Sequence, residues 1–149
     1  METIYNISEL KVSYSTKVKA GDRITIKSSK DAASIMQKIL TDSIEYRETF
    51  LIICLNRKNE VLGYFKVSEG GTTSTVVDSK IIFQIALNCN ASGIILGHNH
   101  PSGNLQPSEA DNSLTRKLKN AGELLDIQVL DHTIVTELGY YSYADEGKI

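Results

Sequence analysis

The chain of 149 residues is 41% hydrophobic and 23% charged, and it carries a net charge of −2. This length suits one domain with one core, and the composition excludes a disordered or low-complexity protein. The nearest approach to a basic cluster is formed by Arg116, Lys117 and Lys119. Because duplex DNA is usually bound through a concentrated basic surface, the charge does not support a nucleic-acid partner.

The sequence shows no sign of a membrane span or a secretory leader. Its N-terminus, METIYNISEL, has neither a basic nor an apolar region, and the longest aliphatic run, 51–55, is far shorter than the ~20 residues that a span requires. Cys54 and Cys89 lie in apolar segments without C-x-x-C spacing, which favours buried thiols over a disulfide or a zinc site. We therefore expect a soluble, cytoplasmic protein, and the sequence gives no indication of its oligomeric state.

Apolar alternation near the start of the chain predicts two strands. The alternating residues are Leu10, Val12 and Tyr14 in the first strand and Ile24 and Ile26 in the second. A turn at residues 20–22, with the sequence Ala-Gly-Asp, would join them. Residues 1–28 are therefore expected to form a β-hairpin extension at the edge of a single domain that covers residues 1–149.

The next segments alternate between helix and strand. Ser28 or Ser29 can cap a helix, and its buried face would comprise Ala32, Ile35, Met36, Ile39 and Leu40. Residues 49–56, TFLIICLN, are apolar on both faces and predict a central buried strand. A turn at 57–59 would return the chain into residues 60–69, EVLGYFKVSE, as a half-exposed antiparallel partner.

The second half continues this alternation. Residues 70–74, GGTTS without a following G-K-[ST], favour a connector over a phosphate loop. The predicted elements are a helix from Ser79, a buried strand at 92–96, a helix from Ser108 to Gly122, and strands at 127–130 and 133–135. Together these elements predict an α/β fold of three layers, with a mixed β-sheet flanked by helices.

Two histidines follow the strand at 92–96. In an extended segment, residues two apart point to the same side, so His98 and His100 could place both imidazoles on one ion. Asp111 lies beside the apolar stripe of the next helix, where a carboxylate needs a compensating charge. Two nitrogens and one oxygen would leave a fourth position open on a tetrahedral ion, as in catalytic zinc sites.

The same acidic residue has a second interpretation. Ser108 and Asp111 satisfy the capping-box pattern, in which both side chains bind amides at a helix N-terminus. An identical S-x-x-D spacing occurs at Ser28 to Asp31, where no histidine is near. The spacing by itself therefore does not distinguish a metal ligand from a cap. The third histidine, His132, stands between two predicted strands, and a structural role is its default interpretation.

Residues 98–111 together form the pattern H-x-H-P-x6-S-x-x-D, which resembles the JAMM motif of JAB/MPN metallopeptidase domains in residue type and spacing. The runs HNHPSG, PSEAD and, at 131–134, DHTI are similar to those of the RadC family, and the resemblance extends from about residue 30 to the C-terminus. It implies the JAB/MPN fold, which is related to the cytidine-deaminase architecture. It also implies a Zn²⁺ ion held by His98, His100 and Asp111.

The resemblance further assigns roles in a reaction. The family places its catalytic glutamate in an R-E-x-F context, which here is Glu48 in the run 47–50. Glu48 would then move protons and the Ser108 hydroxyl would stabilise an oxyanion, in the hydrolysis of a peptide or isopeptide bond of a protein or peptide substrate. The residues alone leave three other bases open, namely Glu45, Glu60 and Glu69. They also leave three candidates for orienting the histidines, namely Asn99, Ser102 and Asp131.

Two further function classes stay open beside a hydrolase. The domain could be a non-catalytic metal-binding module that acts through another protein. It could also be associated with DNA repair, as the family name alone suggests. Zinc-dependent deamination is disfavoured because it calls for H-x-E and P-C-x-x-C, neither of which occurs in the chain.

Overall fold

The structure is a computed structural model, and it describes residues 3–4, 6–70 and 76–149. Of the predicted connector at 70–74, all but Gly70 lies outside these residues. The helices are the short 3-10 helix η1 (Ala20–Asp22), α1 (Ser29–Ile39), α2 (Ser79–Asn88) and α3 (Glu109–Leu124). The strands are β1 (Thr3–Ile4), β2 (Ile7–Ser8), β3 (Thr49–Leu55), β4 (Val61–Glu69), β5 (Gly93–Asn99), β6 (Gln128–Val135) and β7 (Tyr140–Ser142).

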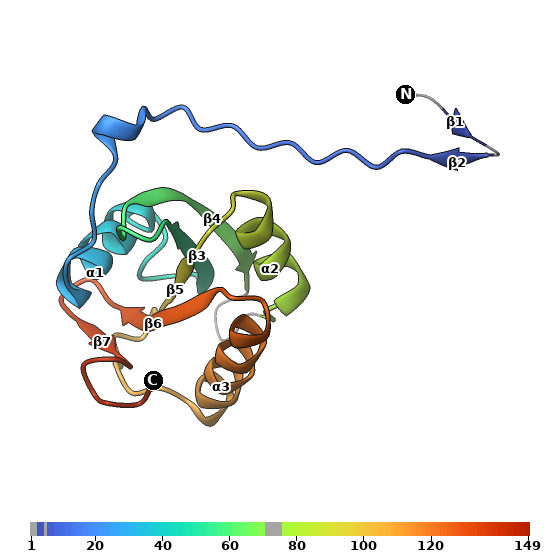
Figure 1. Ribbon diagram of the computed structural model, residues 1–149. Helices are drawn as coiled ribbons and strands as arrows, with labels where there is room; N and C mark the ends of the chain where they lie inside the picture. The colour runs from blue at the N-terminus through green and yellow to red at the C-terminus, as the bar shows by residue number, and fades with distance from the viewer. Residues whose placement is uncertain (1–2, 5, 71–75) are drawn as a thin grey trace.

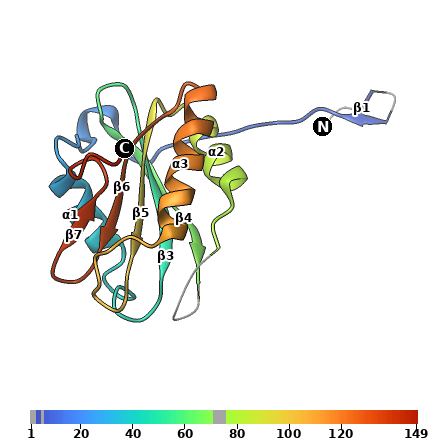
Figure 2. The same ribbon diagram turned by 90° about the horizontal axis from the view of Figure 1, so that it is seen from below.

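Within these described residues, β3 to β7 form one five-stranded sheet in the order β4-β3-β5-β6-β7. The sheet is mixed because β5 and β6 are parallel while the other neighbours are antiparallel. Helix α1 covers one face, and α2 and α3 cover the other (Figure 1 and Figure 2). The predicted three-layer α/β architecture is confirmed.

Strand β3 is buried along its whole length, as its unbroken apolar run predicts. Because side chains alternate along a strand, its two faces join separate apolar clusters. Phe50, Ile52 and Cys54 lie in the cluster beneath α2 and α3, whereas Leu51, Ile53 and Leu55 lie in the cluster beneath α1. Both cysteines of the chain are free and buried, in agreement with the sequence analysis.

The strand register brings three parts of the chain together near one end of the interior strands. Strands β3 and β5 are antiparallel with Phe50 opposite His98, so the start of β3 lies beside the end of β5. Strand β6 runs parallel to β5 and places His132 opposite Leu96. The residue before β3, the histidines that end β5 and the middle of β6 are thereby gathered at the carboxyl end of β5.

The predicted N-terminal hairpin is wrong. Residues 9–16 form no strand, residues 20–22 form η1 instead of a turn, and only Thr25 makes a β-bridge, with Glu60. A different, very short hairpin pairs β1 with β2, on an arm that extends away from the body of the protein (Figure 1). Apolar alternation favours a strand only where a partner and a surface are present, and along this arm Leu10 is 90% exposed.

Two predicted boundaries in the second half are also wrong. Helix α3 continues past Gly122 to Leu124, and the two strands predicted at 127–130 and 133–135 are one strand, β6. Gly122 does not end the helix. It allows the helix to lie close to the backbone of Ile127, because a Cβ at this position would overlap the Ile127 oxygen. The polar pair 131–132 does not interrupt β6, since both side chains have hydrogen-bond partners inside the protein.

Substitution of Gly122 by Ala is expected to destabilise the fold by up to about 2 kcal/mol. Alanine gains about 1 kcal/mol of helix propensity over glycine, but forcing a Cβ against the fixed carbonyl of Ile127 costs about 1–3 kcal/mol or more. Urea denaturation would measure the change. The matched control is Asn120→Ala on the exposed face of the same helix, which should be neutral or slightly stabilising; an equal gain for both variants would contradict the packing role of Gly122.

Candidate metal centre

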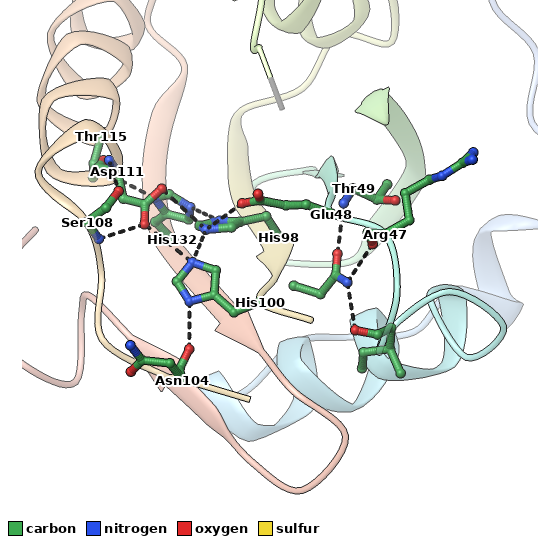
Figure 3. Close-up of polar contacts among 12 residues, drawn as sticks. Arg47, Glu48, Thr49, His98, His100, Asn104, Ser108, Asp111, Thr115 and His132 are labelled. Carbon is green, nitrogen blue, oxygen red and sulfur yellow. Dashed lines mark hydrogen bonds and ion pairs between the residues drawn. The ribbon is translucent and has the colours of Figure 1, made fainter. Parts of the chain in front are cut away.

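Four side chains from three elements converge where β3, β5 and α3 meet (Figure 3). His98 is the second-last residue of β5 (Gly93–Asn99), and His100 directly follows the strand. Their imidazoles therefore point to the same side. Asp111 comes from the first turn of α3, and Glu48 directly precedes β3. His98 is almost fully buried at 1% exposure, while the other three side chains are partly buried.

The distances among the predicted ligands fit a small cation. The Nε2 atoms of His98 and His100 are 3.0 Å apart. The Asp111 carboxylate lies 3.3 Å from Nε2 of His98 through Oδ1 and 3.5 Å from Nε2 of His100 through Oδ2. Ligand atoms placed tetrahedrally at zinc-like bond lengths would be about 3.3 Å apart, so these three groups match one face of a zinc tetrahedron.

Glu48 lies slightly farther from this face. Its Oε1 is 3.8 Å from Nε2 of His98, and Glu48, His98 and His100 form a group whose ligand atoms lie within 4.8 Å of one another. Those three residues could themselves hold a metal. The contacts of Asp111 to both histidines are shorter, however, so the geometry favours Asp111 as the third ligand of a bound metal, with Glu48 adjacent to it.

The electrostatics also favour a cation at this point. Burial opposes the ionisation of Asp111, but hydrogen bonds from His100 and His98 outweigh it and hold the pKa of Asp111 well below its usual range. The pKa of His100 is raised, chiefly by its hydrogen bond with Asp111. Burial raises the pKa of Glu48, and the two histidines offset this only in part. A carboxylate next to two imidazoles therefore favours the binding of one positive charge, either a proton or a metal ion.

Asp111 forms the helix cap that its sequence context allows, and its carboxylate also faces the two histidines. Its Oδ2 accepts a hydrogen bond from the backbone N–H of Ser108 at 2.8 Å, and its own N–H donates to Oγ of Ser108 at 3.0 Å. This is a complete capping box at the start of α3. The cap fixes the carboxylate while Oδ1 still faces His98, so the cap and the histidine contact support each other.

The other candidate bases are engaged elsewhere. Glu45 is fully exposed and pairs with Glu137, which raises its pKa. Glu60 accepts a hydrogen bond from the Asn56 amide at 2.8 Å. Glu69 lies 3.7 Å from the Arg47 guanidinium. Among the glutamates considered from the sequence, only Glu48 lies beside the histidines.

Asn99 has a role that differs from the one predicted. Alternation along β5 turns its side chain away from the histidines, and its amide NH₂ donates to the carbonyls of Ile44 and Arg47 at 2.9 and 2.8 Å. Its Oδ1 accepts from the N–H of Thr49 at 2.8 Å. These three bonds clamp the backbone on both sides of Glu48. Asn99 therefore orients the glutamate, not an imidazole.

Replacing Asn99 by Leu should lower the free energy of unfolding by about 2–4 kcal/mol, because three backbone groups lose their partners in a buried setting. Urea denaturation monitored by circular dichroism would measure the loss. Thr49→Val is the matched control, since the Thr49 hydroxyl has no hydrogen-bond partner among the described residues. If the two variants lost equal stability, the clamp would be unimportant.

The remaining candidates for orienting the histidines also lie elsewhere. Ser102 accepts a hydrogen bond from the N–H of Asn104 at 3.3 Å, which shapes the turn after His100. Asp131 accepts hydrogen bonds from the N–H groups of His132 and Ala144 and from the hydroxyl of Ser142, at 2.7, 2.9 and 2.5 Å. Within the described residues, neither side chain is hydrogen-bonded to an imidazole, so neither orients a histidine directly.

Comparison with known proteins identifies the family of the chain. The family model of RadC-like JAB domains matches residues 26–148 of the chain. The chain belongs to the RadC-like JAB domain family. A UPF0758 protein of Flavobacterium johnsoniae is 48% identical over 122 residues, which are 82% of this chain and 52% of that protein.

Other relatives of this RadC-like JAB domain carry the same printed name. A UPF0758 protein of Thermotoga maritima is 40% identical over 103 residues, 69% of this chain and 46% of that protein. One from Clostridioides difficile is 34% identical over 155 aligned positions, 97% of this chain and 66% of that protein. The chain thus spans about half the length of most of these relatives. In residues 6–70 and 76–149 of this domain, no helix has the length and apolar character that a membrane span requires.

The Nδ1 atoms of the two imidazoles in this RadC-like JAB domain contact Asn104 and His132. Nδ1 of His100 lies 2.6 Å from the backbone oxygen of Asn104, and Nδ1 of His98 lies 2.8 Å from Nε2 of His132 (Figure 3). The sequence pattern contained no spacing that links His132 to His98. The only signal was the DHTI run, which is part of the resemblance to the RadC family.

Proposed function

We propose that this RadC-like JAB domain is a zinc metallohydrolase that cleaves peptide or isopeptide bonds. The observation that carries the proposal is the convergence of His98, His100 and Asp111 with mutual distances of 3.0–3.5 Å, with Glu48 beside them. Two nitrogens and a carboxylate form the donor set of a catalytic zinc site with an open position, whereas structural zinc sites usually have four protein ligands. The names of the relatives specify no activity, so the proposal rests on this geometry.

Glu48 is the group suited to moving protons. When bound, a zinc ion supplies a Lewis acid that acidifies water and polarises a carbonyl. Glu48 is partly buried, and burial raises its pKa, which moves it toward the range in which a carboxylate both accepts and releases a proton near neutral pH. Its carboxylate would accept a proton from the attacking water and then donate it to the leaving amine nitrogen.

Ser108 is the group suited to stabilising negative charge. Its Oγ already accepts a hydrogen bond from the N–H of Asp111, so its hydroxyl proton can be donated to an oxyanion. Ser108 is exposed at the start of α3, where a substrate could reach it. A hollow of about 180 Å³ adjoins His100 and is lined in part by Pro101, Gly103 and Leu138, which offers room for part of a peptide.

A protein or peptide is the partner that this proposal requires. The net charge of −2 gives no support for a nucleic-acid partner, and a role in DNA repair would need one. A cytoplasmic location belongs to the same proposal, and it is supported by two buried thiols that are not joined in a disulfide.

Metal analysis and a cleavage assay on the same preparation test this function. Protein purified without chelator should contain about one zinc ion per chain and should cleave members of a peptide and isopeptide library. Chelation should abolish cleavage and added zinc should restore it. Zinc binding without cleavage of any library member would overturn the hydrolase and support a non-catalytic metal-binding module. Strong salt-dependent binding to duplex DNA would instead favour the DNA-associated alternative.

A further inference from the structure

A chain of hydrogen bonds runs from α3 through β6 to the imidazole of His98 (Figure 3). The Thr115 hydroxyl donates to the backbone oxygen of Asp111 at 2.7 Å and lies 2.7 Å from Nδ1 of His132. Nε2 of His132 then lies 2.8 Å from Nδ1 of His98. The chain therefore begins at the backbone of Asp111 and ends at His98, two residues whose side chains face each other across the candidate metal centre.

The chemistry of the partners fixes the direction of each proton. A backbone carbonyl can only accept, so the single hydroxyl proton of Thr115 is used on Asp111. The contact between Thr115 and His132 therefore needs a proton on Nδ1 of His132. His132 is fully buried, and a neutral ring with its proton on Nδ1 has a bare Nε2. The contact between His132 and His98 then needs a proton on Nδ1 of His98.

The aromatic neighbours hold the His132 ring in this orientation. Tyr143 stacks on it with the ring centroids 4.9 Å apart and an interplanar angle of 7°, and its own hydroxyl donates to Asn112 at 2.7 Å. Phe50 meets His132 edge-on and stacks on His98 at 5.8 Å and 15°. Because the rings are packed in this way, neither imidazole can rotate to exchange its two nitrogens without disturbing its neighbours.

We propose that His132, anchored by Thr115, is a positioning residue that holds His98 with its proton on Nδ1 and its Nε2 lone pair free to bind a metal at the candidate metal centre. The inference rests on the metal site of the proposed function. It assigns a role to two residues that do not touch the ion. The Nδ1 atom of His100 contacts a backbone carbonyl, that of Asn104. Of the two histidines, only His98 has its Nδ1 proton held by a side chain that a substitution can change.

Nitrogen NMR of the histidines tests the proton positions without metal or substrate. At about pH 9, above the ordinary pKa of histidine, the ¹⁵N shifts of the chelator-treated native protein identify which ring nitrogen carries the proton. We expect the proton on Nδ1 in both His98 and His132. A proton on Nε2 of His98 would overturn the proposal, whether or not the protein binds zinc or cleaves peptides.

Zinc affinity, measured by competition with a chelator, tests the consequence for the site. His132→Phe keeps a packed ring but removes the acceptor, and it should weaken zinc binding about 10–100-fold. His132→Gln should restore much of this loss, because its amide oxygen can accept from His98 while its NH₂ donates to Thr115. Thr115→Val should weaken binding in the same direction, and Thr115→Ser should not.

The matched control is Thr133→Val, which removes a buried hydroxyl from the neighbouring position of β6. That hydroxyl has no hydrogen-bond partner among the described residues, so zinc affinity should stay unchanged. Native affinity in a folded His132→Phe protein, or no recovery in His132→Gln, would overturn the proposal. If the native protein bound no zinc, the proposed function would fail, and the NMR result would still decide the role of His132 in orienting His98.

Discussion

Replacement of Glu48 by Gln should lower the rate of peptide cleavage by about 10²–10⁴-fold while zinc content stays at the native level. Glutamine has nearly the shape of glutamate but cannot accept a proton, so the substitution removes the base without opening a cavity. Zinc content should be retained because Asp111, and not Glu48, makes the shorter contacts to both histidines. Single-turnover kinetics and metal analysis of the same sample provide the measurement.

Glu45→Gln is the matched control for this substitution. It changes the same residue type in the same segment, but Glu45 is fully exposed and pairs with Glu137, so cleavage should continue at the native rate. A native rate in Glu48→Gln would show that the base is another group. Loss of zinc from Glu48→Gln would show that Glu48 is itself a ligand, as its grouping with the two histidines within 4.8 Å allows.

The core of this fold could be predicted because local sequence and final environment agree. Residues 49–55 and 93–96 are apolar on both faces, and each occupies an interior strand with helices on both sides. The N-terminal arm could not be predicted in the same way. Alternation in Leu10, Val12 and Tyr14 is a preference for extended backbone, but it does not supply a neighbouring strand, and these side chains are exposed.

The candidate site likewise has residues that the sequence could predict and a residue that it could not. His98, His100 and Asp111 could be identified because their spacing within fourteen consecutive residues, 98–111, places them on one strand end and one helix start. The partner of His98 could not, because His132 comes from another strand and is brought close only by the parallel pairing of β5 with β6. Contacts that depend on strand order leave no periodic trace in the sequence.

Replacement of Asp111 by Ala should have two separable effects, one on zinc binding and one on stability. Zinc affinity should fall by more than the 10–100-fold loss typical of groups that only orient a ligand, because a predicted ligand is removed. The metal-free protein should also lose stability. About 1 kcal/mol of this loss comes from the capping box, and the remainder comes from the ion pair that the carboxylate makes with His98 and His100.

Asp31→Ala isolates the capping contribution. Asp31 occupies the same S-x-x-D position in α1, where its N–H binds Ser28 and its carboxylate accepts from the N–H of Lys27 at 2.8 Å. It has no histidine partner among the described contacts, so Asp31→Ala should cost about 1 kcal/mol and leave zinc affinity unchanged. Equal losses of stability and affinity in the two variants would mean that Asp111 only caps its helix.

The pH dependence of stability provides an independent separation of these effects. The histidines hold the pKa of Asp111 in the folded protein below its ordinary value of 3.8, so the stabilising contribution is present above about pH 4. It is lost as the pH falls through the folded-state pKa, because the protonated carboxyl no longer pairs with the imidazoles. The same pairing raises the pKa of His100, so the contribution is also lost as the pH rises through that folded-state pKa. The difference in unfolding free energy between native protein and Asp111→Ala, both freed of metal, should therefore be largest between about pH 4 and the raised pKa of His100, and it should shrink in strong acid. A difference that stayed constant with pH would assign Asp111 a cap alone and leave the two histidines without their anion.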